Sequence, residues 1–210
     1  MNKDLSNIRK DFTQKELSED TVVENPVHQF RLWLNEAIES EQPEPTAMTL
    51  CTVSPDAIPS ARIVLLKKLD DNTGFWFYTN YDSHKGKDLA HNHHATLNFF
   101  WPLLERQVRI TGTVSKVSIS DSNAYFDSRP LDSRIGAIAS PQSQVIESRD
   151  ELKELLEEAK KGLIQRPKHW GGYALLPNEI EFWQGRASRL HDRIRYRLSG
   201  KDWVRERLAP

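Results

Sequence analysis

Near the end of the sequence, basic and apolar residues alternate in a pattern typical of a β-strand. The basic residues share one parity: Arg189, His191, Arg193, Arg195 and Arg197. The apolar residues share the other: Leu190, Ile194, Tyr196 and Leu198. Because successive side chains point to opposite faces of a strand, one face would pack on a core and the other would present cations. Such crowded cations favour a bound anion, and Trp183 offers a flat surface for an aromatic one. The alternative is that the cations are solvated or paired with acids.

A second candidate anion site lies at the sequence Ser83-His84-Lys85-Gly86-Lys87. Ser83 is a suitable N-cap, which would place Lys85 in the first turn of a short helix. Free backbone N–H groups and the positive end of the helix dipole favour a phosphate there. The alternative is a solvated lysine on a loop.

Further cations lie on the expected second strand and on a later helix. Arg62 and Lys67 have opposite parity, so opposite faces or a bulge could direct them at two separate anions. Tyr125 and Arg129 are four residues apart and would share a helix face, with Ser133 near the start of the following helix. The start of a helix is again a favourable position for an anion.

The elements that must position these residues follow from apolar periodicity and turn residues. Asn25-Pro26 predicts the start of an amphipathic helix that runs to about Glu41. Short strands separated by turns then predict an antiparallel barrel, over Ala47–Ser54, Ser60–Leu69, Phe75–Thr79, Ala95–Trp101 and Arg106–Ser118. Helices are expected from about Ser83, from Ser120 or Asp121 to Ser128, from Asp132 or Ser133, and over Ser148–Lys161, with final strands from Gly171.

Composition limits the class of protein. A chain of 210 residues can form one domain with a substantial core, expected over residues 25–210 after a polar, mobile segment of residues 1–24. The net charge of −1 argues against a broad basic surface for nucleic acid. The single Cys51, the lack of a long apolar run and the polar start predict a soluble, cytoplasmic protein. His91, His93 and His94 lack Cys and carboxylate partners at ligand spacing, so no metal site is expected.

One stretch is more specific than these patterns. Glu181-x-Trp183-Gln184, followed after four residues by Arg189-Leu190-His191-Asp192-Arg193, resembles the signature of the pyridoxamine 5′-phosphate oxidase family. The resemblance covers nearly the whole chain from Arg9 to Pro210. It implies a mainly β, FMN-binding split barrel with helices, working as a homodimer with FMN at the interface. The implied reaction oxidises pyridoxine or pyridoxamine 5′-phosphate to pyridoxal 5′-phosphate: FMN takes a hydride, and O2 reoxidises it, giving hydrogen peroxide.

The resemblance also assigns residues to roles. Arg189 and His191 match catalytic positions. Cofactor contacts are implied for Arg62, Ile63, Val64, Leu65, Leu66, Lys67, Tyr78, Thr79, His84, Lys85, Gln107, Gln142, Ser143, Trp183 and Arg193. Substrate contacts are implied for Arg9, Phe12, Lys67, Tyr125, Arg129, Ser133, Arg189, Leu190 and His191. The chain departs from the family at His84, where Arg is usual, and at Phe12, where many relatives have Tyr.

Two alternatives remain open at this point. A related split-barrel flavoprotein could act on another compound, although the chain keeps the Tyr125, Arg129 and Ser133 set. A non-enzymatic carrier of pyridoxal 5′-phosphate would need the phosphate contacts without those to a flavin. Bound FMN and oxygen uptake with pyridoxine 5′-phosphate would distinguish these alternatives from the oxidase.

Overall fold

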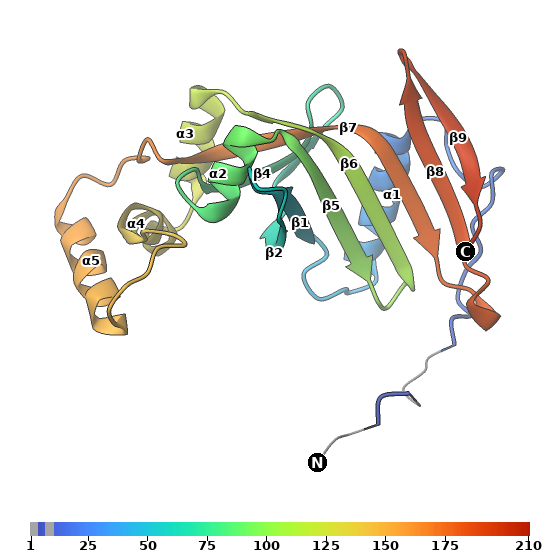
Figure 1. Ribbon diagram of the computed structural model, residues 1–210, viewed down its shortest axis with the longest axis horizontal. Coiled ribbons are helices and arrows are strands. Elements are labelled where there is room, and N and C mark those ends of the chain that lie inside the picture. The colour runs from blue at the N-terminus through green and yellow to red at the C-terminus, as the bar shows by residue number, and fades with distance from the viewer. Residues whose placement is uncertain (1–3, 7–10) are drawn as a thin grey trace. The chain divides into compact units, whose positions relative to one another are not determined.

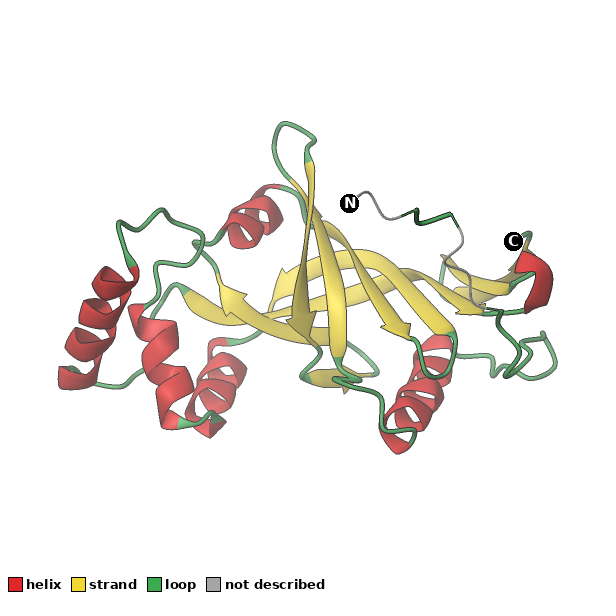
Figure 2. Cartoon of the chain, turned by 90° about the horizontal axis from the view of Figure 1, so that it is seen from below, coloured by secondary structure: helices red, strands yellow, loops and turns green. Residues whose placement is uncertain are grey.

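A computed structural model describes residues 4–6 and 11–210 of the chain (Figure 1). The chain forms two compact units. Unit 1 comprises Met1–Thr46, Asn98–Ile110 and Asn178–Pro210, and unit 2 comprises Ala47–Leu97 and Thr111–Pro177. Three long strands contribute residues to both units: β5 (His94–Trp101), β6 (Arg106–Lys116) and β7 (Trp170–Gln184). The described chain is mainly β with helices, as expected from the sequence (Figure 2).

Unit 2 begins with two antiparallel strand pairs. β1 (Ala47–Val53) pairs with β2 (Pro59–Leu65), and β3 (Lys68–Asp70) pairs with β4 (Gly74–Asn80). The hydrogen-bonded strand order is β2-β1-β5-β6-β7-β4-β3, so the two pairs form opposite ends of this path. The first half of β7 pairs antiparallel with β4, with Trp170 opposite Asn80. The antiparallel pairing confirms the expected fold class.

The expectation of one strand over Ser60–Leu69 is wrong. β2 ends at Leu65, Leu66 is buried at 5% exposure, and the Lys67 N–H donates to the Trp76 carbonyl at 2.8 Å. The chain therefore exchanges its partner β1 for its partner β4 within a few residues. Simple alternation does not persist across such a break, so Arg62 and Lys67 are not confined to opposite faces.

Side-chain caps fix most helix starts in unit 2. Ser83 caps α2 (His84–His91), its Oγ accepting from the Gly86 N–H at 3.3 Å, and Ser148 caps α5 (Arg149–Lys161) as expected. α3 (Ile119–Ser128) starts earlier than expected, because Ser118 is the residue whose Oγ accepts from the Asp121 N–H. α4 (Leu131–Ala139) begins directly after Pro130, so Ser133 lies within its first turn rather than at its start.

Unit 1 packs α1 (Pro26–Glu39) on strands through aromatic side chains. Asn25 caps α1 as predicted, accepting from Val27 and His28. Phe30 meets Phe99 with ring centroids 4.9 Å apart, and Trp33 meets Phe182 at 5.1 Å. The unit ends with a 3-10 turn η1 (Ala187–Arg189) and the hairpin of β8 (Asp192–Ser199) and β9 (Asp202–Leu208). No helix in the described part of the chain is both long and apolar enough to cross a membrane.

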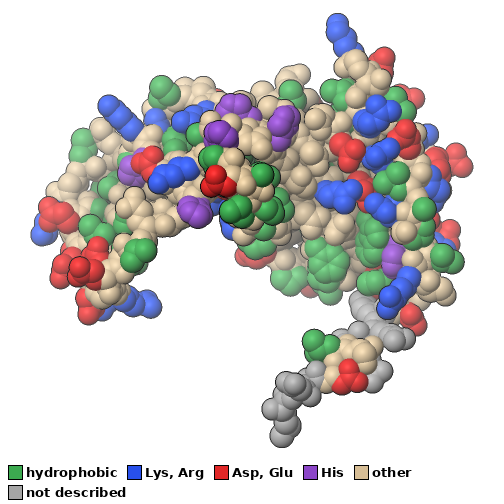
Figure 3. All heavy atoms as spheres, viewed as in Figure 1, with side chains coloured by type: hydrophobic (Ala, Val, Ile, Leu, Met, Phe, Trp, Pro, Cys, Tyr) green, Lys and Arg blue, Asp and Glu red, His purple; other side chains and the backbone are tan. Residues whose placement is uncertain are grey.

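The expected row of five cations on one strand face is only partly present. Ile194 and Tyr196 are fully buried on the opposite face of β8, as the parity predicted, but Arg189 and His191 precede the strand. The remaining arginines are paired: Arg193 with Glu181, and both Arg195 and Arg197 with Glu206. Pairing with acids on neighbouring strands is therefore the correct interpretation of this face. Figure 3 shows acidic and basic side chains interspersed over the drawn surface.

Candidate active site

Unit 2 contains a cavity of about 610 Å³, a volume suited to a small cofactor or substrate. It is lined by residues that the sequence singled out: Arg62, Ile63, Val64, Leu65, Lys67, Tyr78, Thr79, His84, Lys85, Tyr125, Arg129, Gln142 and Ser143. Asn80 and Trp170 line it as well. Within the described part of the chain, no Asp or Glu lines this cavity. The cavity, called the cationic cavity below, is therefore built for an anion.

Lys85 is buried, which excludes the interpretation of a solvated lysine on a loop. The residue is 9% exposed, and its Nζ donates to Gln142 Oε1 at 2.8 Å and to Ser83 Oγ at 3.2 Å. Burial, together with the nearby charge of Arg62, lowers the pKa of the Lys85 ammonium to about 8. A phosphate at the start of α2 would offset the free-energy cost of burying the charged ammonium. It would also accept hydrogen bonds from the free backbone N–H groups of the first helical turn.

Arg62 reaches the same cavity from β2. Its Nη1 donates to Thr52 Oγ1 at 2.7 Å and to the Leu50 carbonyl at 3.2 Å, both on the partner strand β1. Burial lowers the pKa of the guanidinium, although Asp88 opposes the shift. Because its charge also depresses the pKa of Lys85, the two cations act on one region of the cavity.

The cavity wall formed by α3, β4 and β7 is aromatic. Tyr78 and Tyr125 stack with ring centroids 3.8 Å apart, and the ring of Trp170 is parallel to that of Tyr125 within 5°. The Arg129 guanidinium lies 4.7 Å from the centroid of Trp170. Arg129 Nη1 is buried and has no hydrogen-bond partner among the described residues. An arginine fork held over an aromatic face with a free donor is a typical receptor for a phosphate.

The loop after α4 completes this side of the cavity. Gln142 Oε1 accepts from both Lys85 Nζ and Thr79 Oγ1, and Ser143 has a left-handed backbone with φ of 69°. Two predicted residues of unit 2 lie outside the lining: Leu66 is in the core, and Ser133 is half-buried on α4. Asn80 and Trp170 carry no local signal in the sequence, since they meet only through the pairing of β4 with β7.

The predicted residues of unit 1 form an aromatic cluster. His191 lies 4.6 Å from Trp183 between ring centroids, and Phe12 lies 5.7 Å from each of them in edge contacts. His191 Nδ1 accepts from the Arg186 N–H at 3.1 Å, which leaves Nε2 as the proton-carrying nitrogen when the ring is neutral. Burial and the charge of Arg189 both lower the pKa of His191.

The remaining predicted residues of unit 1 differ in their surroundings. Arg189 and Leu190 are exposed, and Arg189 has a left-handed backbone with φ of 61°, as does Ser188 at 55°. Consecutive left-handed residues other than glycine are strained, a feature often found at functional sites. Arg193 is paired with Glu181, and Gln107 is half-buried on β6. Arg9 lies outside the described residues.

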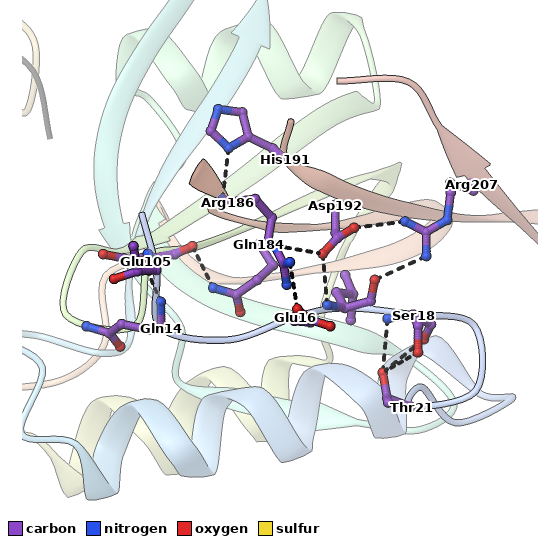
Figure 4. Close-up of polar contacts among 12 residues, drawn as sticks. Gln14, Glu16, Ser18, Thr21, Glu105, Gln184, Arg186, His191, Asp192 and Arg207 are labelled. Carbon is purple, nitrogen blue, oxygen red and sulfur yellow. Dashed lines mark hydrogen bonds and ion pairs between the residues drawn. The ribbon is translucent and has the colours of Figure 1, made fainter. Parts of the chain in front are cut away.

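Hydrogen bonds hold the segment of residues 11–21 against the rest of unit 1 (Figure 4). The buried Glu105 accepts from the Thr13 and Gln14 N–H groups at 2.9 and 3.2 Å. Asp192 accepts from the Leu17 N–H at 3.1 Å and from Arg207 at 2.9 Å. The same segment brings Phe12 against Trp183 and against His191, which is one of the two residues predicted to be catalytic.

Comparisons with known proteins identify the family of the chain. Residues 34–161 match the model of the family "Pyridoxamine 5′-phosphate oxidase", and residues 170–210 match "Pyridoxine 5′-phosphate oxidase C-terminal dimerisation region". Relatives named pyridoxine/pyridoxamine 5′-phosphate oxidase include one from Verminephrobacter eiseniae, 56% identical with 100% of both chains covered. Another, from Salinibacter ruber, is 54% identical with 98% of this chain and 99% of that one covered.

Solved structures support the split-barrel fold. PhzG from Burkholderia lata 383, in complex with tetrahydrophenazine-1-carboxylic acid, has a TM-score of 0.86 and 30% identity, covering 91% of this chain and 95% of that chain. A pyridoxamine 5′-phosphate oxidase-related, FMN binding protein from Nostoc punctiforme has a TM-score of 0.70 at 16% identity, covering 86% and 97%. With the signature around His191, the cationic cavity and the two family models in agreement, the chain belongs to the pyridoxamine 5′-phosphate oxidase family.

Proposed function

We propose that the chain oxidises pyridoxine 5′-phosphate and pyridoxamine 5′-phosphate to pyridoxal 5′-phosphate with FMN as its cofactor. The observation that carries this proposal is the cationic cavity, in which three separate segments direct Arg62, Lys85 and Arg129 at one volume that no described acid lines. Both the substrates and FMN are phosphorylated aromatic rings. They match a cavity with cations and an aromatic wall.

The residues present fit FMN. Lys85, Arg62 and the start of α2 would hold the phosphate, and Gln142 and Ser143 would contact the adjacent polar chain. Trp183, Gln107 and Arg193 would contact the flavin, with donors near the ring carbonyls where negative charge develops during reduction. Bound FMN would supply the redox chemistry, taking a hydride equivalent from the substrate carbon and giving two electrons to O2 as hydrogen peroxide; the imine formed from the amine substrate would react with water and release ammonia.

The substrate phosphate would be held by Lys67, Tyr125, Arg129 and Ser133. The free donor of Arg129 and its support on Trp170 suit this role, since a preoriented fork loses little freedom on binding. Anchoring the phosphate fixes the position of the reacting carbon and raises its effective concentration. Ser133 would contribute from the first turn of α4, a favourable position for an anion.

Arg189 and His191 would act at the pyridine ring and the reacting carbon. The lowered pKa of His191 favours a neutral imidazole, and because Nδ1 accepts from the Arg186 N–H, the Nε2–H would donate a hydrogen bond to the substrate near the reacting carbon. Arg189, which is exposed and held in a strained conformation, would orient the ring. Phe12, Leu190 and Arg9 would cover the substrate.

The chain would work as a homodimer, which the match of residues 170–210 to a dimerisation region supports, and FMN would bind at the interface. The purified protein should be yellow and release FMN on denaturation. Adding pyridoxine 5′-phosphate should then cause oxygen uptake with formation of hydrogen peroxide. A colourless protein with no affinity for FMN would overturn the proposal.

A second candidate function is oxidation of a carboxylated, phosphate-free ring compound. The similarity to PhzG, whose structure holds tetrahydrophenazine-1-carboxylic acid, favours testing it. The two functions differ in their need for phosphate. Oxygen uptake should occur with pyridoxine 5′-phosphate and be lost with unphosphorylated pyridoxine; uptake with tetrahydrophenazine-1-carboxylic acid instead would support the second candidate.

A further inference from the structure

A buried carboxylate lies behind the cationic cavity without lining it. Asp88 is on α2, three residues after Lys85, and is 7% exposed. Its Oδ2 accepts from Thr52 Oγ1 at 2.6 Å and from Ser60 Oγ at 3.3 Å. Thr52 and Ser60 are directly opposite each other on β1 and β2. The carboxylate therefore ties α2 to a cross-strand pair of hydroxyls.

The same two hydroxyls contact Arg62. Its Nη1 donates to Thr52 Oγ1 at 2.7 Å, and its Nη2 donates to Ser60 Oγ at 2.5 Å. A guanidinium can only donate and an ionised carboxylate can only accept, so each hydroxyl accepts from Arg62 and can donate to Asp88, although the two hydroxyls also lie 3.2 Å from each other. Two hydrogen-bonded bridges therefore join Arg62 to Asp88, one through Thr52 and one through Ser60. Both bridges are complete only when each hydroxyl proton points to Asp88.

We propose that Asp88 is a positioning residue that orients Arg62 toward the cofactor phosphate through Thr52 and Ser60. This inference rests on the proposed FMN site. Asp88 does not line the cavity, so it can offset the free-energy cost of burying Arg62 without lying directly against a phosphate. The two bridges also use Nη1 and Nη2 together, which fixes the plane of the guanidinium rather than one bond.

We call the hydrogen-bonded set of Asp88, Thr52, Ser60 and Arg62 the relay. The test compares Asp88→Asn with Asp82→Asn, because Asp82 is an exposed acid just before α2 that lies outside the relay. Both variants remove one negative charge near the same helix, but only Asp88→Asn changes the relay. We expect Asp88→Asn to weaken FMN binding about tenfold while changing riboflavin binding less than about threefold, since riboflavin lacks the phosphate. Turnover at saturating FMN should stay within about twofold, because Asp88 touches no reacting atom.

Two further variants separate positioning from folding. Ser60→Ala removes one bridge from a half-buried site while Asp88 stays, and we expect a smaller, FMN-selective loss of about threefold. In an Arg62→Ala background, Asp88→Asn should cause no further loss of FMN affinity, because its effect passes through Arg62. Equal FMN affinities for Asp88→Asn and Asp82→Asn would overturn the relay while leaving the proposed function intact. Wild-type protein without affinity for FMN would overturn both.

Discussion

Lys85 is the residue through which pH should act on cofactor binding. Its pKa of about 8 in the free protein follows from burial and from the charge of Arg62. A phosphate favours the protonated amine and raises this pKa, so FMN binds the protonated form. Between about pH 7 and 8 the amine is largely protonated and the phosphate is doubly charged, so the affinity should change little; above about pH 8 the affinity should fall about tenfold per pH unit. Fluorescence titration of FMN across this range measures the effect.

Two controls assign that pH dependence to Lys85. Riboflavin, which has no phosphate, should show a much weaker dependence in the same range. Lys85→Arg should remove the fall above pH 8, because a guanidinium stays protonated there. An FMN affinity that is constant through about pH 10 in the wild-type protein would contradict the prediction.

Trp170 should contribute to substrate binding as well as to the stability of the fold. Replacing it with Leu removes the face over which the Arg129 guanidinium lies, at 4.7 Å from the ring centroid. We expect the KM for pyridoxine 5′-phosphate to rise about three- to tenfold, with kcat less affected. Trp76→Leu is the matched control, since Trp76 is equally buried and also carries a cation, Lys68, but does not line the cavity. Equal KM values in the two variants would contradict the assignment.

Arg189 should affect turnover more than cofactor binding. It is exposed and, in the proposed mechanism, contacts the substrate ring rather than FMN. Arg189→Ala should lower kcat/KM at least about a hundredfold, whereas the dissociation constant of FMN changes less than about threefold. Steady-state oxygen uptake and flavin titration measure the two quantities. Parallel losses of turnover and FMN affinity would contradict a catalytic role.

At the scale of elements, the start of α2 depends on one close backbone approach. A Cβ on Gly86 would lie 2.1 Å from the Tyr81 carbonyl oxygen, whereas one on Gly136 of α4 meets nothing within 4 Å. Gly86→Ala should therefore destabilise the protein by about 1–3 kcal/mol and weaken FMN binding, since Lys85 must move with the helix. Gly136→Ala should be neutral or stabilising by up to about 1 kcal/mol. Denaturant unfolding of both variants tests this difference, and equal stabilities would contradict it.

Local sequence predicted these elements wherever the determining contacts are local. Asn25 and Ser83 cap their helices as expected, because an N-cap bonds only to residues two or three positions away. The start of α3 differs from the expected Ser120 or Asp121, because Ser118 is an equally good cap by residue type. The break between β2 and β3 could not be predicted, since it reflects the exchange of one partner strand for another.

At the scale of the whole molecule, the proposed assembly is a homodimer. Residues 170–210 match a dimerisation region, and in the proposal FMN lies at the interface. Light scattering should give twice the 24.3 kDa of one chain. Dilution below the dimer dissociation constant should then release FMN, because its site would lose residues from one subunit. A monomer that retains FMN at full affinity would contradict an interfacial site.

The sequence by itself determined which residue types are available and what lies next to what along the chain. It predicted the helix whose first turn contains Lys85 and the burial of Ile194 and Tyr196 on one face of a strand. It also contained the family signature around His191. Tertiary structure decided which charges remain available to a ligand. Arg195 is neutralised by Glu206 across a strand pair, and Asp88 is buried behind Arg62, whereas Arg129 keeps a free donor above Trp170. The physical reason is that charge pairing and burial depend on strand register and packing between distant segments, which no local pattern specifies.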